Sequence, residues 1–312
     1  MTSMTPDSRV HIAGHTGMVG RALVRRLEAD GFNRLILRNH AELDLTNQRA
    51  VHAFYATERP EFVILAAARV GGIHANSAYP ADFIRDNLAI QTNVIHSAWA
   101  HGARKLLFLG SSCIYPRDCA QPIREEYLLT GPLEISNEAY AIAKIAGIKM
   151  CGAYRRQYGF NTICAMPTNL YGPGDNYHPE NSHVVAALIR KFLEAKQSGD
   201  DRVVIWGSGE PQREWLHVDD MADALVLLMR MYDNETIVNI GSGQETTIRE
   251  LARTIADIVG YQGTLAFDGT RPDGVPRKRL EISRLQSLGW RPRISLEAGL
   301  RATIAAHAAG HP

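Results

Sequence analysis

Two short segments of the sequence carry side chains that could move protons. Ser111, Ser112 and Cys113 are consecutive, and Tyr140 and Lys144 lie four residues apart. Residues with that spacing share one face of a helix, so the Lys144 ammonium could lower the pKa of the Tyr140 phenol toward neutrality. Such a phenol can protonate a carbonyl oxygen while hydride adds to the carbon. Cys113 would offer a second proton-transfer group, which reduction alone does not need.

A glycine-rich turn near the N-terminus indicates a dinucleotide site. Gly14, Gly17 and Gly20 follow the apolar segment 10–13 and precede a helical pattern over 21–29. In such a turn, glycine allows positive φ and a close approach of the backbone to a pyrophosphate, which the helix N-terminus attracts. A plain turn is the competing interpretation, but the strand before it and the helix after it favour a dinucleotide.

The residue at the end of the second predicted strand, 34–37, bears on which dinucleotide is bound. An acidic residue there would bind the ribose hydroxyls of NAD. This sequence instead has Arg38, with His40 close by, and a cation suits the 2′-phosphate of NADP. The sequence therefore favours NADP(H), although Arg38 could also be an ordinary surface residue at a strand end.

Composition limits the classes of function. The chain has 34 Lys and Arg against 33 Asp and Glu, so it has no broad field for nucleic acid or an anionic membrane. Its four cysteines include no Cys-x-x-Cys pair and do not form a disulfide framework in 312 residues. Residues 1–9 lack an apolar export segment, and 62–68 is too short to span a bilayer. We expect a cytoplasmic protein with reduced thiols, no metal site and no nucleic-acid or membrane partner.

Strands and helices alternate along the first half of the chain. Strands are predicted at 10–13, 34–37, 62–67, 105–109 and 162–166, and helices at 21–29, 48–57, 82–101 and 140–158. This order predicts an α/β fold, a doubly wound parallel sheet of the Rossmann type. Later elements are predicted at 184–195, 203–206, 217–231, 237–240, 247–259 and 296–309, with a carboxylate in 218–220 capping the helix 217–231.

Two domains follow from this pattern. We place an NADP-binding domain at 1–171, completed by about 215–243, and a smaller C-terminal α/β domain, mainly for substrate, at 172–312. A cleft over the carboxyl ends of the strands would then lie between them, where ligands bind in such sheets.

Taken together, these motifs resemble the extended, nucleotide-sugar-modifying branch of the short-chain dehydrogenase/reductase superfamily, and within it the GDP-L-fucose synthase family. The similarity covers almost the whole chain, in order, and rests on the segments 14–20, 70–73, 109–116, 140–149, 167–173, 181–183 and 272–278. Members epimerise GDP-4-keto-6-deoxy-D-mannose at C3 and C5 and then reduce C4 with NADPH. The resemblance therefore implies that activity, a GDP-sugar substrate, and a homodimer paired through 82–101 and 140–158.

The resemblance also implies site residues. Ser111, Tyr140 and Lys144 match the reductase group, and Cys113 and His183 match the epimerisation pair, with Cys113 as base and His183 as acid or the reverse. The cofactor positions that match are Gly14, Thr16, Gly17, Met18, Val19, Gly20, Arg38, His40, Leu109, Gly110, Ser111, Ser112, Tyr140, Lys144, Pro167, Asn169, Leu170 and His183. The substrate positions that match are Lys191, Trp206, Arg213 and Lys278.

Some positions depart from the family pattern. Some members carry Arg in place of Thr16 and of His40, both near the 2′-phosphate, so Arg38 would have to compensate, with Arg69 as a second candidate. Other interpretations also stay open for the substrate positions. Arg213 could pair with Glu214, Lys191 and Lys278 could lie on a solvated face, and Trp206 could be a core aromatic.

The chemistry of epimerisation supports the pairing of Cys113 with His183. Protons on C3 and C5 flank the C4 ketone, so removing one gives an enolate, and inversion needs a base on one face and an acid on the other. Cysteine and histidine exchange protons near neutral pH. By residue type alone, however, Cys113 could be a buried apolar residue and His183 a surface or helix-capping one.

Three alternatives to the synthase remain. A related GDP-4-keto-6-deoxy-sugar C4 reductase, for example one acting on a heptose, could keep Cys113 and His183 with little or no epimerase activity. A dehydratase is less favoured, because Cys113 and Ile114 stand where an acidic pair would be. A non-catalytic NADP-binding sensor would have no need for Tyr140 and Lys144.

Overall fold

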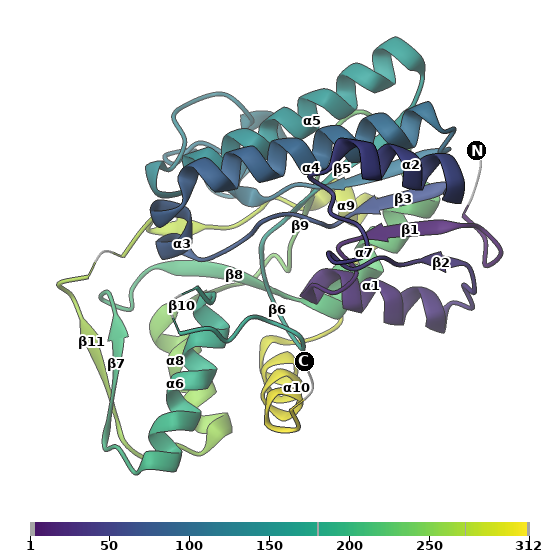
Figure 1. The fold of residues 1–312 in the computed structure, drawn as a ribbon. Coiled ribbons are helices and arrows are strands. Elements are labelled where there is room, and N and C mark those ends of the chain that lie inside the picture. The colour runs from purple at the N-terminus through teal and green to yellow at the C-terminus, as the bar shows by residue number, and fades with distance from the viewer. Residues whose placement is uncertain (1–3, 180, 272, 311–312) are drawn as a thin grey trace.

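A parallel sheet forms the centre of the structure, a computed structural model that describes residues 4–179, 181–271 and 273–310 (Figure 1). Within these residues the sheet has six strands in the order β2-β1-β3-β4-β5-β9, all paired in parallel. They are β1 (Val10–Ala13), β2 (Leu35–Ile36), β3 (Phe62–Leu65), β4 (Lys105–Leu109), β5 (Asn161–Pro167) and β9 (Val238–Ile240). The predicted doubly wound parallel sheet is confirmed.

Helices cover both faces of this sheet, which is why β1, β3 and β4 are buried along their whole length rather than at alternate residues. One face is covered by α1 (Met18–Ala29) and α7 (Val218–Met231). The other is covered by α2 (Gln48–Glu58), α4 (Pro80–Ala100) and α5 (Glu138–Tyr158), which lie side by side in Figure 1. The short helix α3 (Ile73–Ala78) precedes α4.

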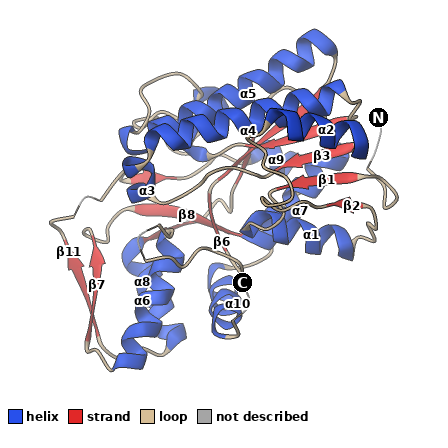
Figure 2. Cartoon of the chain, in the orientation of Figure 1, coloured by secondary structure: helices blue, strands red, loops and turns tan. Residues whose placement is uncertain are grey.

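Smaller sheets are built mainly from the second half of the chain (Figure 2). In one, β8 (Gln212–His217) pairs with β6 (Asn169–Tyr171), β10 (Glu245–Thr247) and β12 (Arg277–Lys278); in the other, β7 (Arg202–Trp206) pairs with β11 (Thr264–Asp268). A third apolar core joins α6 (Val184–Ser198), α8 (Ile248–Val259) and α10 (Leu296–Ala308). The remaining elements are α9 (Ser283–Ser287) and the 3₁₀ turns η1 (Ser112–Ile114), η2 (Glu125–Tyr127) and η3 (Ile135–Asn137).

The two halves of the chain are interleaved. β9 comes late in the sequence but pairs with β5 at the edge of the central sheet, and α7 packs on α1. The domain limits at 1–171, 215–243 and 172–312 remain a prediction. Within the described residues, no helix is both long and apolar enough to cross a bilayer.

Candidate active site

The glycine turn after β1 has the shape that a dinucleotide needs. Gly14 has a φ of 89°, and a Cβ there would lie 2.7 Å from the Ala67 backbone. A Cβ on Gly20 would lie 2.1 Å from the Gly14 carbonyl oxygen, so α1 packs against the turn at a distance that only glycine allows. Gly17 is the N-cap of α1 and provides no side-chain cap, and the first turn has no acidic side chain. This helix N-terminus therefore fits a pyrophosphate.

The other predicted residues of this turn lie beside it. Thr16 is exposed, and its carbonyl oxygen accepts a hydrogen bond from Arg21 Nε at 2.8 Å. Met18 and Val19 form the first turn of α1 and are partly buried against the core beneath it. Their backbone N–H groups are on the turn that would face the phosphates.

The two side chains expected to hold a 2′-phosphate, Arg38 and His40, are both near the end of β2. Arg38 donates to Glu58 Oε1 at 2.7 Å and to the Leu37 carbonyl oxygen at 2.8 Å, and its guanidinium lies 5.9 Å from the Phe54 ring centre. His40 is 85% exposed, and its nearest carboxylate, Asp44, is 3.9 Å away. Glu58 therefore already neutralises part of the Arg38 charge, whereas His40 is open to solvent.

Arg69 is committed to helix α4 rather than to this end of the cofactor site. Its guanidinium lies 2.8 Å from Asp86 and 3.2 Å from Asp82, and it stacks on Phe83 at 5.6 Å. Compensation by Arg69 for Thr16 and His40 would need these ion pairs to break.

The carboxyl end of β4 leads directly into the predicted catalytic segment. Leu109 ends the strand, and Gly110 N donates to the Ala165 carbonyl oxygen at 2.9 Å. A Cβ on Gly110 would meet the Met166 side chain at 2.4 Å, so the backbone passes close to β5. Ser112 is buried in η1, and the Ser111 hydroxyl accepts the Cys113 N–H at 3.2 Å, which fixes the turn.

The neighbouring strand ends contribute the predicted Pro167, Asn169 and Leu170. Pro167 ends β5, and Asn169 and Leu170 begin β6. Asn169 Nδ2 donates to the Glu214 carbonyl oxygen at 3.0 Å, so its amide is used to join β6 to β8. These residues lie at the same edge of the central sheet as Ser111, since β4 and β5 are parallel neighbours.

Tyr140 and Lys144 share one face of α5, as their spacing predicts, but the electrostatics are opposite to the expectation. Burial raises the pKa of Tyr140 above its ordinary range; the nearby Cys113 adds to the rise, and a hydrogen bond with Ser111 opposes it. Burial also lowers the pKa of Lys144 to about 7. The predicted lowering of the Tyr140 pKa is wrong in this structure.

The position of the ammonium gives the reason. Lys144 Nζ donates to the Leu109 carbonyl oxygen at 2.8 Å and lies 5.8 Å from the centre of the Tyr140 ring. It is therefore bound to a neutral acceptor at the end of β4. In this poorly solvated place the charged forms of both side chains are penalised.

Cys113 is partly buried beside Tyr140, with two polar side chains near its sulfur. Asn137 Nδ2 lies 3.3 Å from Sγ, and Lys278 Nζ lies 3.7 Å from it. Asn137 was not singled out in the sequence analysis. It is the N-cap of α5, and its place directly before the helix that carries Tyr140 is the signal that could have identified it.

His183 stands at the N-cap of α6, 47% exposed, with its Nδ1 3.9 Å from Asp175 Oδ1. In the described part of the chain no hydrogen bond joins its ring to Cys113 or Tyr140. The segment before it is nevertheless close to the site, because Gly72 N donates to the Asn181 carbonyl oxygen at 3.4 Å. The loop at Gly72 leads into α3 and α4, and Phe83 of α4 packs edge-on against Tyr140.

The predicted substrate residues come from β7, β8, β12 and α6. Arg213 and Lys278 are register partners on β8 and β12. Arg213 is not paired with Glu214, whose buried carboxylate accepts N–H groups from Gly243 at 2.6 Å and Leu280 at 2.9 Å. Burial lowers the pKa of Arg213, and Asp273 opposes this effect.

Lys191 and Trp206 form a second group of substrate candidates. Trp206 is 62% exposed and thus not a core aromatic. Lys191 Nζ lies 5.7 Å from its ring centre and donates to the Val204 carbonyl oxygen at 2.9 Å, and the Arg271 guanidinium lies 4.9 Å from the ring. An exposed indole flanked by two cations can stack on a flat base that carries phosphates.

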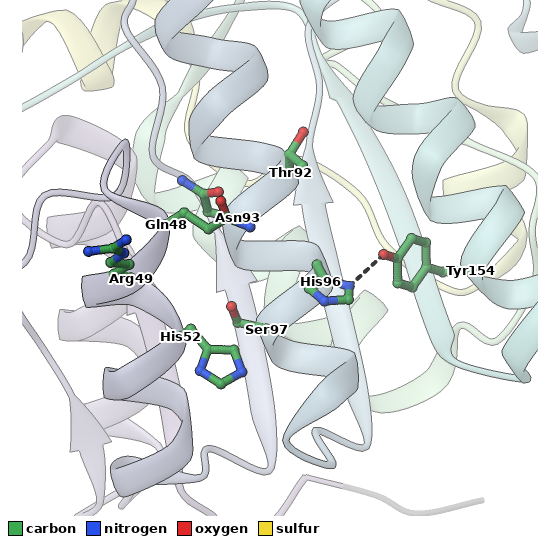
Figure 3. A pocket seen from close by; sticks show the side chains of 8 residues that line it. All are labelled: Gln48, Arg49, His52, Thr92, Asn93, His96, Ser97 and Tyr154. Atoms are coloured by element: carbon green, nitrogen blue, oxygen red, sulfur yellow. Dashed lines mark hydrogen bonds between the residues drawn. The ribbon is translucent and has the colours of Figure 1, made fainter.

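A separate hollow of about 550 Å³ lies between α2, α4 and α5 (Figure 3). It is lined by Gln48, Arg49, His52, Thr92, Asn93, His96, Ser97 and Tyr154, none of them a predicted site residue. His96 Nδ1 and the Tyr154 hydroxyl are 2.8 Å apart at one side of it. The described residues contain no cluster of side chains that could hold a metal ion.

The parallel sheet, the glycine turn and the group at the end of β4 define a class: dinucleotide-dependent α/β enzymes that reduce or epimerise their substrates. The sequence model of the NAD dependent epimerase/dehydratase family matches residues 10–241. The chain belongs to this family and, within it, to the GDP-L-fucose synthase family, as its curated relatives show.

GDP-L-fucose synthase 1 of Arabidopsis thaliana is 60% identical, over 97% of this chain and 94% of that protein. GDP-L-fucose synthase of Escherichia coli K12 is 55% identical, over 95% of each chain. The predicted resemblance is therefore confirmed.

Solved structures agree in fold over nearly the whole chain. A GDP-L-fucose synthetase from Naegleria fowleri bound to NADP has a TM-score of 0.92 at 28% identity, covering 99% of this chain and 95% of that one. A GDP-6-OMe-4-keto-L-xylo-heptose reductase from C. jejuni has a TM-score of 0.94 at 37% identity, covering 99% and 100%.

Proposed function

We propose that the protein converts GDP-4-keto-6-deoxy-D-mannose to GDP-L-fucose, by epimerisation at C3 and C5 and reduction at C4, with NADPH as cofactor. The observation that carries this proposal is the grouping of Ser111, Cys113 and Tyr140 at the carboxyl end of β4. Relatives of this function at 55–60% identity support it.

The C4 carbonyl oxygen is held between the Ser111 and Tyr140 hydroxyls, which act as hydrogen-bond donors. Cys113 removes the proton at C3 or C5, and the resulting enolate carries negative charge on that same oxygen. The two hydroxyls stabilise this charge more strongly than they stabilise the ketone. His183 returns a proton to the opposite face, which inverts the carbon; the roles of Cys113 and His183 could also be exchanged.

Reduction uses the same oxygen site. NADPH, when bound, supplies the hydride that adds to C4. Tyr140 gives its phenolic proton to the oxygen, and because the pKa of Tyr140 is raised, the phenol carries that proton at neutral pH. Lys144, fixed on the Leu109 carbonyl oxygen, holds the strand end and α5 together.

The cofactor and substrate occupy adjacent elements in this proposal. The turn at Gly14, Gly17 and Gly20 holds the pyrophosphate of the cofactor, and Arg38 with His40 receives its 2′-phosphate. Arg213 binds the substrate diphosphate, for which a guanidinium has the matching geometry. Trp206 and Lys191 bind the base end. The segment 1–171 with about 215–243 would then be the cofactor domain, and 172–312 mainly the substrate domain.

A C4 reductase for a related heptose is the second candidate, favoured by structural neighbours that are GDP-heptose reductases at 37–38% identity. NMR of the products formed from GDP-4-keto-6-deoxy-D-mannose and NADPH in D₂O separates the two. GDP-L-fucose with deuterium at C3 and C5 is the expected product. A 4-reduced sugar without inversion or label would identify a plain reductase. If no NADPH were oxidised, the protein would be one that binds the cofactor without catalysing a reaction.

We also propose a cytoplasmic location and a homodimer. All four cysteines are free thiols, which suits a reducing compartment. The homodimer would pair through α4 and α5, which pack together as one outer layer. Trp99, Tyr154 and Tyr158 form an aromatic cluster at one end of that layer.

A further inference from the structure

Lys278 comes from the C-terminal half of the chain but reaches the predicted epimerisation thiol. It lies on β12, and its Nζ is 3.7 Å from Cys113 Sγ. This contact joins residues 165 positions apart in the sequence. The resemblance alone implies only that Lys278 is a substrate-binding position.

The backbone around Lys278 is fixed on both sides. On one side β12 pairs with β8, and Gln212 N donates to the Pro276 carbonyl oxygen at 2.9 Å. On the other side Ile123 N donates to the Arg279 carbonyl oxygen at 2.7 Å, and Glu281 N donates to the Ile123 carbonyl oxygen at 2.8 Å. The position of the ammonium is thus set by two segments that the N-terminal and C-terminal halves provide.

The adjacent cations are bound elsewhere. Arg277 lies 2.5 Å from Glu245, and Arg279 lies 3.6 Å from it. In the part of the chain that the structure describes, Lys278 makes no ion pair with a carboxylate. The other titratable groups near this contact are Tyr140, beside Cys113, Cys119, beside Lys278, and Arg213, the register partner of Lys278 on β8, which faces Asp273. Burial raises the pKa of Tyr140 and of Cys119, and Lys278 opposes the rise at Cys119. Among these groups, Lys278 is the cation in contact with the Cys113 sulfur, at 3.7 Å.

We infer that Lys278 is a positioning residue that stabilises the thiolate of Cys113 and so makes Cys113 the base of epimerisation. A positive charge within about 4 Å favours the charged form of a thiol. Because β12 supplies this charge, Cys113 can act as the base only when the sheet that contains β8 and β12 is packed against η1. The inference rests on the proposed function for its catalytic meaning, but the effect on the thiolate can be measured without substrate.

The test is the pH dependence of Cys113 alkylation by iodoacetamide, read by mass spectrometry of peptides. Tryptic cleavage at Arg117 puts Cys113 and Cys119 into different peptides. In Lys278→Met, the pH of half-maximal Cys113 alkylation should rise by about one unit, and Lys278→Arg should largely restore it. Arg277→Met is the matched control, because it removes a cation one residue away that faces Glu245, and its alkylation profile should match the wild type.

A second readout separates this role from substrate binding. With GDP-4-keto-6-deoxy-D-mannose in D₂O, Lys278→Met should lose at least about tenfold in exchange at C3 and C5 while still reducing an already epimerised 4-keto sugar. An unchanged alkylation profile with a raised KM would overturn the inference and leave Lys278 as a substrate ligand. If the wild-type protein turned over no GDP-4-keto sugar but Lys278→Met still shifted the alkylation profile of Cys113, the proposed function would be refuted. The effect of Lys278 on the thiolate would then still stand.

Discussion

Tyr140 and Lys144 show how burial changes what two side chains can do. Their spacing places them on one face of α5, but the Lys144 ammonium is bound to the Leu109 carbonyl oxygen and not to the phenol. The phenol therefore keeps its proton, which suits a group that must protonate an oxygen. The ammonium, with its pKa lowered to about 7, is close to losing its own.

This lowered pKa makes a prediction about stability. An unfolded Lys144 has the ordinary value of 10.5, so between about pH 7 and pH 10 the unfolded chain binds more protons than the folded one. Lys144 therefore makes the unfolding free energy rise with pH, by up to about 1.4 kcal/mol per pH unit. Lys144→Met should lack that rise in urea unfolding between about pH 7 and pH 9. The exposed Lys149→Met is the control, and parallel curves for wild type and Lys144→Met would contradict the prediction.

Cys113→Ser should separate the two halves of the reaction. A hydroxyl is a far weaker acid than a thiol, so the variant lacks a base for C3 and C5 but keeps Ser111 and Tyr140 for reduction. We expect solvent exchange into a GDP-4-keto sugar to fall about 100-fold or more, with reduction of an epimerised substrate within about threefold of wild type. Wild-type exchange in the variant would remove Cys113 from the mechanism.

Tyr140→Phe should have the complementary effect. The variant keeps Cys113 and the Ser111 hydroxyl but lacks the proton donor for the reduced oxygen, so NADPH oxidation should fall about 100-fold or more. Exchange at C3 and C5 should be reduced less, because Ser111 still holds the enolate oxygen. Stopped-flow absorbance of NADPH and NMR of the label measure the two quantities, and unchanged NADPH turnover would contradict the assignment.

How much of the site could be predicted depends on how its residues are connected. Ser111 and Cys113 directly follow β4, and Tyr140 and Lys144 lie on one face of α5. Their spacing and the order of the elements are therefore enough to predict that they lie together. The contact between Cys113 and Lys278 spans two sheets, and no local pattern encodes it. The pKa shifts of Tyr140 and Lys144 also depend on burial by segments that are distant in the sequence, and residue spacing gives no information about that burial.

At the scale of elements, the turn between β1 and α1 carries two glycines with different structural demands. A Cβ on Gly17 would be 3.5 Å from the Gly14 carbonyl oxygen, an ordinary contact, whereas on Gly20 it would be 2.1 Å away. Gly17 has a φ of −76°, which any residue can adopt. The missing side chain at Gly17 therefore leaves space for a ligand, whereas the missing side chain at Gly20 allows α1 to pack against the backbone of Gly14 and His15.

These demands predict different outcomes for two similar substitutions. Gly20→Ala should lower the unfolding free energy by about 1–3 kcal/mol, because the new methyl group meets backbone atoms. Gly17→Ala should change stability by less than about 0.5 kcal/mol but weaken NADPH binding about tenfold or more, because the methyl group occupies the space of the pyrophosphate. Thermal unfolding with and without NADPH measures both, and Gly269→Ala, with nothing within 4 Å, is the control. Equal NADPH affinity in Gly17→Ala and wild type would contradict the site.

The main strands and helices were predictable because their signals are local. Apolar runs identified β1, β3, β4 and β5, and helical periodicity identified the long helices. The strands β6, β10 and β12 were missed because two or three residues are too few to show a period. The longer β8 and β11 were also missed. The cap of α7 was predicted as a carboxylate, but it is the His217 ring, which accepts the Asp219 N–H at 3.2 Å; Asp220 instead accepts N–H groups from Arg293 and Ile294.

At the scale of the whole molecule, Glu214 shows how distant segments are brought together. It is fully buried, and burial raises its pKa. Its carboxylate accepts N–H groups from Gly243 and Leu280, and its carbonyl oxygen accepts the Asn169 amide. One residue thus joins β8 to β6, to the loop before β10 and to the segment after β12. This arrangement places Arg213 and Lys278 next to the carboxyl ends of the central strands.

The outer layer of α4 and α5 leads to a prediction about assembly. Tyr158 is 45% exposed and stacks on Trp99 at 4.1 Å between ring centres, so the cluster presents aromatic surface where the homodimer is proposed to form. Analytical ultracentrifugation of the wild-type protein should give a mass of twice the 34.5 kDa of one chain. Tyr158→Asp should weaken the dimer about tenfold or more while keeping wild-type circular dichroism, because a carboxylate there would be buried against its copy.

The control uses a large, somewhat more exposed residue on the other side of the sheet. Met231, at the end of α7, is 56% exposed, and Met231→Asp should leave the sedimentation unchanged. If both variants dissociated the dimer, general destabilisation would be the cause and not the α4–α5 layer. If wild type sedimented as a single chain, the pairing would be refuted. The active site could still be complete, since every catalytic side chain proposed above belongs to one chain.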